Sequence, residues 1–174
     1  MKIPRNLFIN RPYYQDERGS LKLISCPTAP IETTYPELGT EPTQIVITNT
    51  NPHTGRGLHF QKSSPLLQVV SVIHGEIIEC MIKREVADNN YTYTPYSQKI
   101  KSTDEDSTFI VPPGWGHGFF TKNSSAVLLY LVWGARNLSD EFGLNLKSSA
   151  FKFLDETLKD KIFLNERDSK YEYI

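Results

Sequence analysis

The sequence of 174 residues lacks the features that define several common classes of protein. It has no apolar run near the roughly 18 residues that a transmembrane helix requires, and residues 1–6 do not begin an apolar signal segment. Its 19 Lys and Arg residues nearly balance its 20 Asp and Glu residues, and the charged segments are short and scattered. We therefore expect a cytoplasmic protein that binds neither nucleic acid nor a membrane.

Cysteine is also scarce. Cys26 and Cys80 both lie in apolar, strand-like stretches, and in a cytoplasmic protein such residues are expected to be reduced and buried. The chain shows no internal repeat, low-complexity tract or linker, and its length suits one domain that needs no disulfide. The sequence thus predicts a single domain over residues 1–174.

Short apolar or β-branched runs, separated by turn residues, make up most of the chain. This pattern is typical of an all-β barrel or sandwich. Glycine beside a polar residue at His74-Gly75, between two apolar runs, predicts a hairpin. Helical spacing occurs only late, over Phe151–Phe163, and predicts a short amphipathic helix packed on the barrel. The predicted strands are 19–25, 44–50, 66–73, 76–82, 91–100, 108–111 and 126–133.

Two of the four histidines lie in glycine-containing stretches that follow turns. They are His59, within Arg-Gly-Leu-His-Phe-Gln at 56–61, and His117, within Pro-Pro-Gly-Trp-Gly-His-Gly-Phe at 112–119. Inward side chains of a small barrel converge on one interior, so both could line a single pocket. The glycines would let a ligand approach the backbone, and Arg56 would supply a guanidinium for phosphate oxygens. A structural, hydrogen-bonded role for each histidine is the alternative.

A cupin-type metal site is not predicted. Such a site usually uses a His-x-His pair, a nearby Glu and a later His, but the residue two positions after His59 is Gln61. No carboxylate follows within the next turn. His53 and His74 lie in turn-rich stretches and are expected to face solvent. We therefore predict neither a metal nor another cofactor.

The motifs together resemble those of the dTDP-4-dehydrorhamnose 3,5-epimerase family. The two histidine motifs, in this order and spacing, are the most specific part of the resemblance, which also includes 16–21, Gln44, 75–76, Tyr130 and 164–168. The resemblance implies a cupin-type jelly-roll β-barrel with short C-terminal helical segments, usually paired as a homodimer. It also implies action on a nucleotide-linked 4-keto sugar.

By this resemblance His59 is the general base, Asp168 the carboxylate that orients its ring, and Tyr130 the acid that reprotonates the opposite face. A proton beside a ketone is too weak an acid for water at neutral pH, but an imidazole can remove it if the enolate is stabilised. The implied reaction inverts C3, C5 or both in the biosynthesis of an unusual sugar. Taken without the resemblance, Tyr130 is typical of a core strand and Asp168 of a solvated tail.

The resemblance assigns substrate binding to further positions. Arg18, Gln44 and Arg56 match positions that contact the nucleotide or its pyrophosphate, and Arg18 is expected to reach across the dimer interface. His117 is expected to line the sugar pocket. Gln68 stands where the family generally carries a lysine that stabilises the enolate oxygen.

Departures from the family pattern concern substrate recognition more than the base and acid. The Gln68 amide lacks a lysine's charge, and a charge-assisted hydrogen bond is roughly twice as strong as a neutral one. Val46 replaces a usual asparagine and Glu79 a usual aspartate. We therefore expect a divergent epimerase. Two alternatives stay open: a nucleotide-sugar 3,4-ketoisomerase, which more usually has a histidine where this chain has Gln61, and a non-catalytic nucleotide-sugar-binding cupin.

Overall fold

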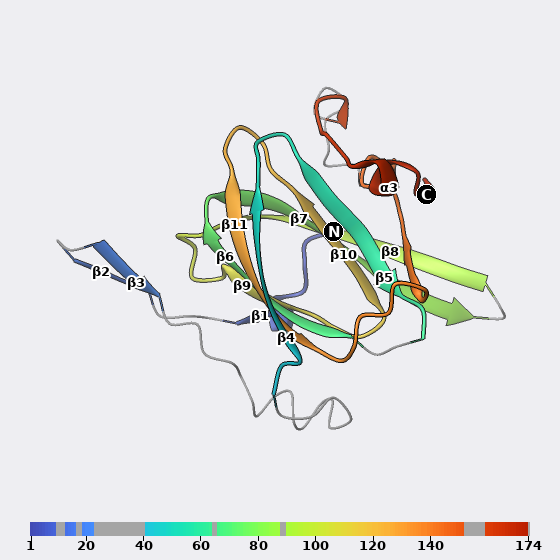
Figure 1. Ribbon diagram of the computed structural model, residues 1–174, viewed down its shortest axis with the longest axis horizontal. Coiled ribbons are helices and arrows are strands. Elements are labelled where there is room, and N and C mark those ends of the chain that lie inside the picture. Colours follow the sequence, from blue (N-terminus) through green and yellow to red (C-terminus); the bar gives the residue numbers. More distant parts are fainter. Residues whose placement is uncertain are drawn as a thin grey trace.

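Two five-stranded antiparallel sheets face each other in the computed structural model (Figure 1). The structure describes residues 1–9, 13–16, 19–22, 41–63, 66–87, 90–151 and 159–173, with the backbone alone for 13–16, 19–22, 87 and 90. Within these ranges no helix has the length and apolar character needed to cross a bilayer.

The first sheet has the strand order β1-β9-β6-β11-β4. Its strands are β1 (Phe8–Ile9), β4 (Gln44–Thr50), β6 (Leu67–His74), β9 (Thr108–Val111) and β11 (Ala126–Trp133). The second sheet has the order β12-β5-β10-β7-β8. Its strands are β5 (Gly55–Gln61), β7 (Glu76–Ala87), β8 (Asn90–Lys101), β10 (Trp115–Phe120) and β12 (Glu141–Gly143). The remaining elements are the 3-10 helix η1 (Arg5–Leu7), a hairpin of β2 (Tyr13–Asp16) and β3 (Gly19–Lys22), and the short helix α3 (Glu166–Ser169).

Most connections carry the chain from one sheet to the other. From β4 to β7, and again from β8 to β12, consecutive strands alternate between the two sheets, whereas β7 and β8 form a hairpin. This is the jelly-roll arrangement of the cupin type, and it confirms the predicted all-β fold. The strands β4, β9 and β11 have the predicted bounds.

The predicted hairpin at His74-Gly75 is wrong. The strands β6 and β7 belong to different sheets, so this turn passes the chain between layers. Gly75 has a φ of 82°, and a Cβ added there would lie 2.3 Å from the Ser125 carbonyl oxygen. The local signal for a turn was correct, but it could not tell which strands the turn would pair.

Other local predictions have mixed outcomes. Cys80 is buried and reduced, as predicted, while Cys26 lies outside the described residues. His74 is exposed, but His53 is half-buried, which corrects its expected exposure. The middle of the predicted helix, 152–158, lies outside the described residues.

Strand alternation decides which side chains enter the space between the sheets. In β11, Tyr130 and Val132 belong to the inner core cluster. In β7, Ile77 and Met81 belong to the same cluster, and Glu79 lies on the same face between them. Polar residues at such alternate positions therefore point into the interior for the same geometric reason as the apolar ones.

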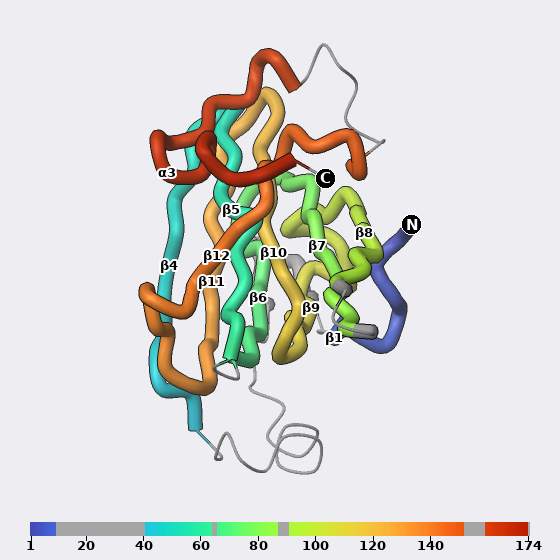
Figure 2. The backbone as a smooth tube through the Cα atoms, turned by 90° about the vertical axis from the view of Figure 1, so that its right-hand side faces the viewer, coloured from blue at the N-terminus to red at the C-terminus, as the bar shows by residue number. Residues whose placement is uncertain are grey.

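The outer face of the second sheet is covered by the chain that follows β12. Figure 2 shows this C-terminal part of the chain running over β5 and β12, with α3 at one end of the strands. The buried cluster there joins sheet residues to later ones: Leu58, Phe60, Ile78, Cys80, Ile82, Phe120, Leu144, Leu146, Phe151 and Ile162. This packing brings α3 into contact with β5.

Glycines let β5 and β10 approach closely. A Cβ at Gly57 would lie 2.8 Å from the Gly118 Cα, and one at Gly118 would lie 2.7 Å from the Arg56 carbonyl oxygen. Both contacts involve rigid backbone, so even one added methyl group would have to push the strands apart. These two glycines therefore serve the approach of one strand to another, while their expected role in approach of a ligand stays a prediction.

Replacing Gly118 with alanine should test this packing. The added Cβ meets backbone atoms that have no rotamer through which to escape, so the free energy of unfolding should fall by about 1–3 kcal/mol. Urea denaturation measures the change. The exposed Ser124→Ala substitution is the control and should alter stability by no more than about 0.5 kcal/mol. Equal stability of the two variants would contradict the packing argument.

Candidate active site

A cavity of about 250 Å³ opens between the two sheets. Its lining includes every predicted site residue that the structure describes, namely Gln44, Arg56, His59, Gln68, His117, Tyr130 and Asp168. Arg18 lies outside the described residues. Side chains separated by more than a hundred positions in the sequence thus meet in one space.

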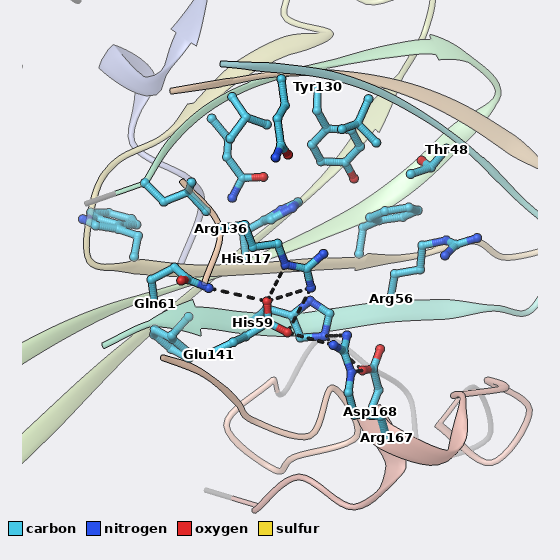
Figure 3. Close-up of a pocket in the computed structure, with 18 of the residues that line it drawn as sticks. Thr48, Arg56, His59, Gln61, His117, Tyr130, Arg136, Glu141, Arg167 and Asp168 are labelled. Carbon is cyan, nitrogen blue, oxygen red and sulfur yellow. Dashed lines mark hydrogen bonds and ion pairs between the residues drawn. The ribbon is translucent and has the colours of Figure 1, made fainter. Parts of the chain in front are cut away.

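His59 and Asp168 form a hydrogen-bonded pair at one side of the cavity (Figure 3). The distance from His59 Nε2 to Asp168 Oδ1 is 3.0 Å, and the backbone N–H of Gly57 donates to the other carboxylate oxygen, also at 3.0 Å. Asp168 is only 1% exposed. The carboxylate therefore fixes both the imidazole ring and the strand that carries it.

The sequence around Asp168 places it at the first turn of α3. The Asn165 side chain caps this helix by accepting a hydrogen bond from the Asp168 backbone N–H at 2.7 Å. Burial alone would raise the pKa of the Asp168 carboxyl. The hydrogen bond to His59, the charge on His59, the Gly57 N–H and the Arg167 charge outweigh burial and hold that pKa below its usual value. Asp168 is thus an anion that its surroundings keep ionised.

A second histidine–carboxylate pair lies on the neighbouring strands. His117 is opposite His59 in the β5–β10 register, and its Nδ1 lies 2.8 Å from Glu79 Oε1. Glu79 is fully buried, and burial raises the pKa of its carboxyl despite the opposing effect of His117. Its second oxygen, Oε2, has no hydrogen-bond partner among the described residues. This carboxyl therefore favours retention of a proton within the pair.

Tyr130 faces the cavity from β11, in the sheet opposite His59 (Figure 3). Its ring centroid lies 5.8 Å from that of His117. Burial, followed by the negative charge of Glu79, raises the pKa of the Tyr130 phenol well above its usual value. The phenol is consequently held protonated, as a proton donor must be before it acts.

Three predicted binding residues, Gln44, Gln68 and Arg56, also line the cavity. Gln44 and Gln68 lie on either side of Val132 in the strand register, on the same inner face as Tyr130. Arg56 is anchored through Nε to Thr50 Oγ1 at 2.9 Å and through its NH2 group to a backbone carbonyl. These residues offer amide groups and one guanidinium group to a ligand.

Sequence reasoning missed a cluster built around Glu141. Its nearly buried carboxylate accepts hydrogen bonds from Arg136 at 2.7 and 3.0 Å and from Arg167 at 2.8 Å. Gln61 lies within 3.5 Å of the same carboxylate. Arg167 adjoins Asp168 in the stretch that carried the family resemblance, and this was the available signal. Arg136 and Glu141 belong to no recognisable motif. The pairing of β12 with β5 places Glu141 beside the cavity, and Arg136 is held there by its hydrogen bonds to Glu141.

The cavity's histidines do not gather a metal-ligand set. Within the described residues no group of three or more His, Cys, Asp or Glu side chains has suitable geometry. Gln61, at the position where a cupin would place its second histidine, instead accepts the Asn137 backbone N–H at 3.1 Å.

The lowered pKa of Asp168 makes a prediction about acid stability. A carboxyl whose folded pKa is below its unfolded value of about 3.8 stabilises the fold above that value, and the contribution disappears as pH falls through the folded pKa. Between roughly pH 5 and pH 2, Asp168→Asn should therefore lose less unfolding free energy than the wild type. Urea denaturation across this range measures the loss. The exposed Asp160→Asn control should follow the wild type, and an Asp168→Asn curve that does the same would contradict the assignment.

Solved structures with the same architecture come from several bacteria. A dTDP-4-dehydrorhamnose 3,5-epimerase from Elizabethkingia anophelis is 22% identical with a TM-score of 0.74, over 96% of this chain and 90% of that one. A dTDP-6-deoxy-D-glucose-3,5-epimerase from Legionella pneumophila is 20% identical with a TM-score of 0.70, over 94% and 85%. A 3′-monoepimerase from Streptomyces bikiniensis is 14% identical with a TM-score of 0.71, over 94% and 80%. At these identities the likeness establishes the fold.

Sequence comparison establishes the family. A dTDP-4-dehydrorhamnose 3,5-epimerase from Methanothermobacter thermautotrophicus is 32% identical over 75 residues, which span 43% of this chain and 40% of that protein. The family model described as dTDP-4-dehydrorhamnose 3,5-epimerase matches residues 1–174. The chain therefore belongs to the dTDP-4-dehydrorhamnose 3,5-epimerase family of isomerases.

Proposed function

We propose that this protein epimerises a nucleotide-linked 4-keto-deoxy sugar, with His59 as the base and Tyr130 as the acid. The observation that carries the proposal is the position of these side chains on opposite sheets of one cavity. Inversion of a carbon requires removal of a proton from one face and delivery of a proton to the other. A base and an acid facing each other across a bound ring meet this requirement.

The surroundings of each group suit its role. Asp168 is held as an anion, so it can orient the His59 ring and stabilise the imidazolium that forms when His59 takes the proton. Tyr130 is held as a phenol, so it has a proton to deliver. In the proposed cycle the C–H bond beside the ketone breaks, its electron pair forms the enolate, and Tyr130 protonates the opposite face. Solvent then resets both groups.

The enolate oxygen needs a hydrogen-bond donor, and the pair of His117 and Glu79 can supply it. In one form of the pair, a neutral imidazole lies beside an ionised carboxylate. If the pair holds one proton more than this form, Nε2 of His117 carries hydrogen. This holds whether the extra proton resides on Glu79 or on the ring, since Nδ1 engages Glu79 in both cases. The fully buried carboxyl and its unpartnered oxygen support that protonation state. Gln68 would add a neutral donor where the family generally has lysine.

Thymidine diphosphate is the nucleotide we propose. The Legionella pneumophila structure holds dTDP-4-keto-L-rhamnose, and a Bacillus anthracis relative, 19% identical, holds TDP and pyrophosphate. In this chain Arg56 would face the diphosphate and Gln44 the nucleoside. The anchoring of Arg56 by neutral partners supports this, because its positive charge stays available to phosphate oxygens.

Proton exchange with solvent tests the reaction directly. Proton NMR in deuterated buffer should show loss of the C3 signal, the C5 signal or both from a dTDP-linked 4-keto-6-deoxy sugar, because each enolate can take up deuterium. His59→Asn should slow this exchange by about 10²–10⁴-fold, the usual contribution of a positioned base. Tyr130→Phe should retain part of the exchange while losing inversion.

The exposed His74→Asn variant is the matched control and should behave like the wild type. Exchange that survives His59→Asn would remove His59 from the role of base. Equal loss of exchange and inversion in Tyr130→Phe would make that residue structural. A wild-type protein that binds the nucleotide sugars without any exchange would be a binding module.

We also propose that the protein acts as a homodimer. Strand β4 is the edge of its sheet within the described part of the chain, and Ile45 and Ile47 on its outer face are 67% and 69% exposed. Gln44 and Val46, which alternate with them, face the cavity. Figure 1 shows the β2–β3 hairpin standing away from both sheets. An apolar edge strand beside a site, together with a hairpin that extends outward, suits a second copy of this chain.

Ile47→Lys should weaken the dimer. A lysine there would be removed from water at the interface, so the dimer dissociation constant should rise about tenfold or more. Sedimentation equilibrium measures this. Leu138→Lys replaces an equally exposed apolar residue in the loop before β12, and that control should leave association unchanged. A monomeric wild type, or equal behaviour of the variants, would exclude this interface.

A further inference from the structure

One nitrogen of the proposed base has two neighbours with opposite requirements (Figure 3). His59 Nε2 lies 3.0 Å from Asp168 Oδ1 and 2.9 Å from the NH2 group of Arg167. An ionised carboxylate can only accept a hydrogen bond, and a guanidinium can only donate one. The nitrogen is a donor when it carries hydrogen and an acceptor when it does not. It therefore cannot satisfy both neighbours at once.

Each neighbour favours a different tautomer of the neutral ring. With hydrogen on Nε2, the ring donates to Asp168 and leaves a lone pair on Nδ1, where a substrate proton can be accepted. With hydrogen on Nδ1, Nε2 accepts from Arg167, so neither ring nitrogen has a free lone pair. Only the tautomer favoured by Asp168 makes His59 a base.

The contacts around Arg167 favour the inactive tautomer. Asp168 already accepts from the Gly57 N–H through Oδ2 and from Arg167 Nε through Oδ1, at 3.0 and 3.2 Å. It therefore has donors without His59. The NH2 group of Arg167, by contrast, finds its acceptor among the described residues at His59 Nε2. Placing hydrogen on Nδ1 gives the Arg167 NH2 group its acceptor and leaves Asp168 its two other donors, although the Nε2 lone pair then faces Asp168 Oδ1. Placing it on Nε2 instead turns two N–H groups toward each other.

The Glu141 cluster holds Arg167 in this position. The NH1 group of Arg167 donates to Glu141 Oε1 at 2.8 Å, and the nearly buried Glu141 is fixed in turn by two bonds from Arg136. Yet the Arg167 side chain is 46% exposed and lines the cavity, so a ligand can reach it. An anionic oxygen attracts a guanidinium N–H more strongly than a neutral imidazole does, because both partners then carry opposite charges.

We propose that Arg167 is a positioning residue that sets the tautomer of His59. In the unliganded protein it holds hydrogen on Nδ1. When the diphosphate of a nucleotide sugar draws its NH2 group away, Nδ1 loses its proton to solvent and Nε2 takes one up. The Nε2–H then donates a hydrogen bond to Asp168, and Nδ1 becomes the base. This proposal rests on the assignment of His59 as the base under the proposed function.

Imidazole nitrogen NMR reads the tautomer without any turnover. Protein labelled with ¹⁵N-histidine is studied at about pH 8.5, well above the usual imidazole pKa of about 6.5, and the His59 signals are those missing from His59→Asn. The unliganded wild type should show hydrogen mainly on Nδ1. Arg167→Met, which removes the donors but keeps the length, should show it mainly on Nε2. Adding thymidine diphosphate to the wild type should cause the same change.

Arg5→Met is the matched control. It removes an exposed guanidinium that pairs with Asp106 and does not line the cavity, so it should keep the wild-type tautomer. Hydrogen on Nε2 in the unliganded wild type, or no change in Arg167→Met, would overturn the proposal. An unchanged tautomer with thymidine diphosphate would overturn its ligand-driven step. Because the readout needs no reaction, failure here is distinguishable from failure of the proton-exchange experiment.

Discussion

The close approach of β5 and β10 is the constraint on which the site depends. Gly57 and Gly118 let the backbones meet where a side chain would hold them apart, and this sets the register that places His59 opposite His117. The same segment of β5 donates the Gly57 N–H to Asp168. Because one short stretch of backbone fixes both histidines and the carboxylate, a shift of one residue in this pairing would turn one of the two histidines to the other face of the sheet.

Two histidine–carboxylate pairs on one sheet differ in what surrounds the acid. Asp168 has a backbone N–H and a guanidinium beside it, and its pKa is lowered, whereas Glu79 is fully buried with an unpartnered oxygen, and its pKa is raised. Environments that push the pKa values of like groups apart commonly separate acid and base roles. Under the proposed function, the ionised Asp168 suits the first pair to orient a base, and the raised carboxyl pKa of Glu79 suits the second pair to retain a proton.

The sequence was most informative where period-two alternation and special backbone residues coincide. The bounds of β4, β9 and β11 and the inward positions of His59 and Tyr130 follow from local patterns together with the family motifs. The sheet assignment of the turn at Gly75 did not follow, because a turn signal does not identify the pairing partner. Nor did the Glu141 cluster, since its members come together only when β12 pairs with β5 and the C-terminal chain folds over the sheet.

The guanidinium groups at the described cavity wall are not equivalent, and their difference bears on the loss of the family's lysine at Gln68. Arg136 and Arg167 share the carboxylate of Glu141, so much of their charge is compensated locally. Arg56 is held by a hydroxyl and a carbonyl, which leave its charge to attract phosphate. Under the proposed function, this uncompensated positive charge would lie toward the diphosphate. Beside the ketone, a proton shared by the buried pair of His117 and Glu79 would then do locally what a lysine would otherwise do.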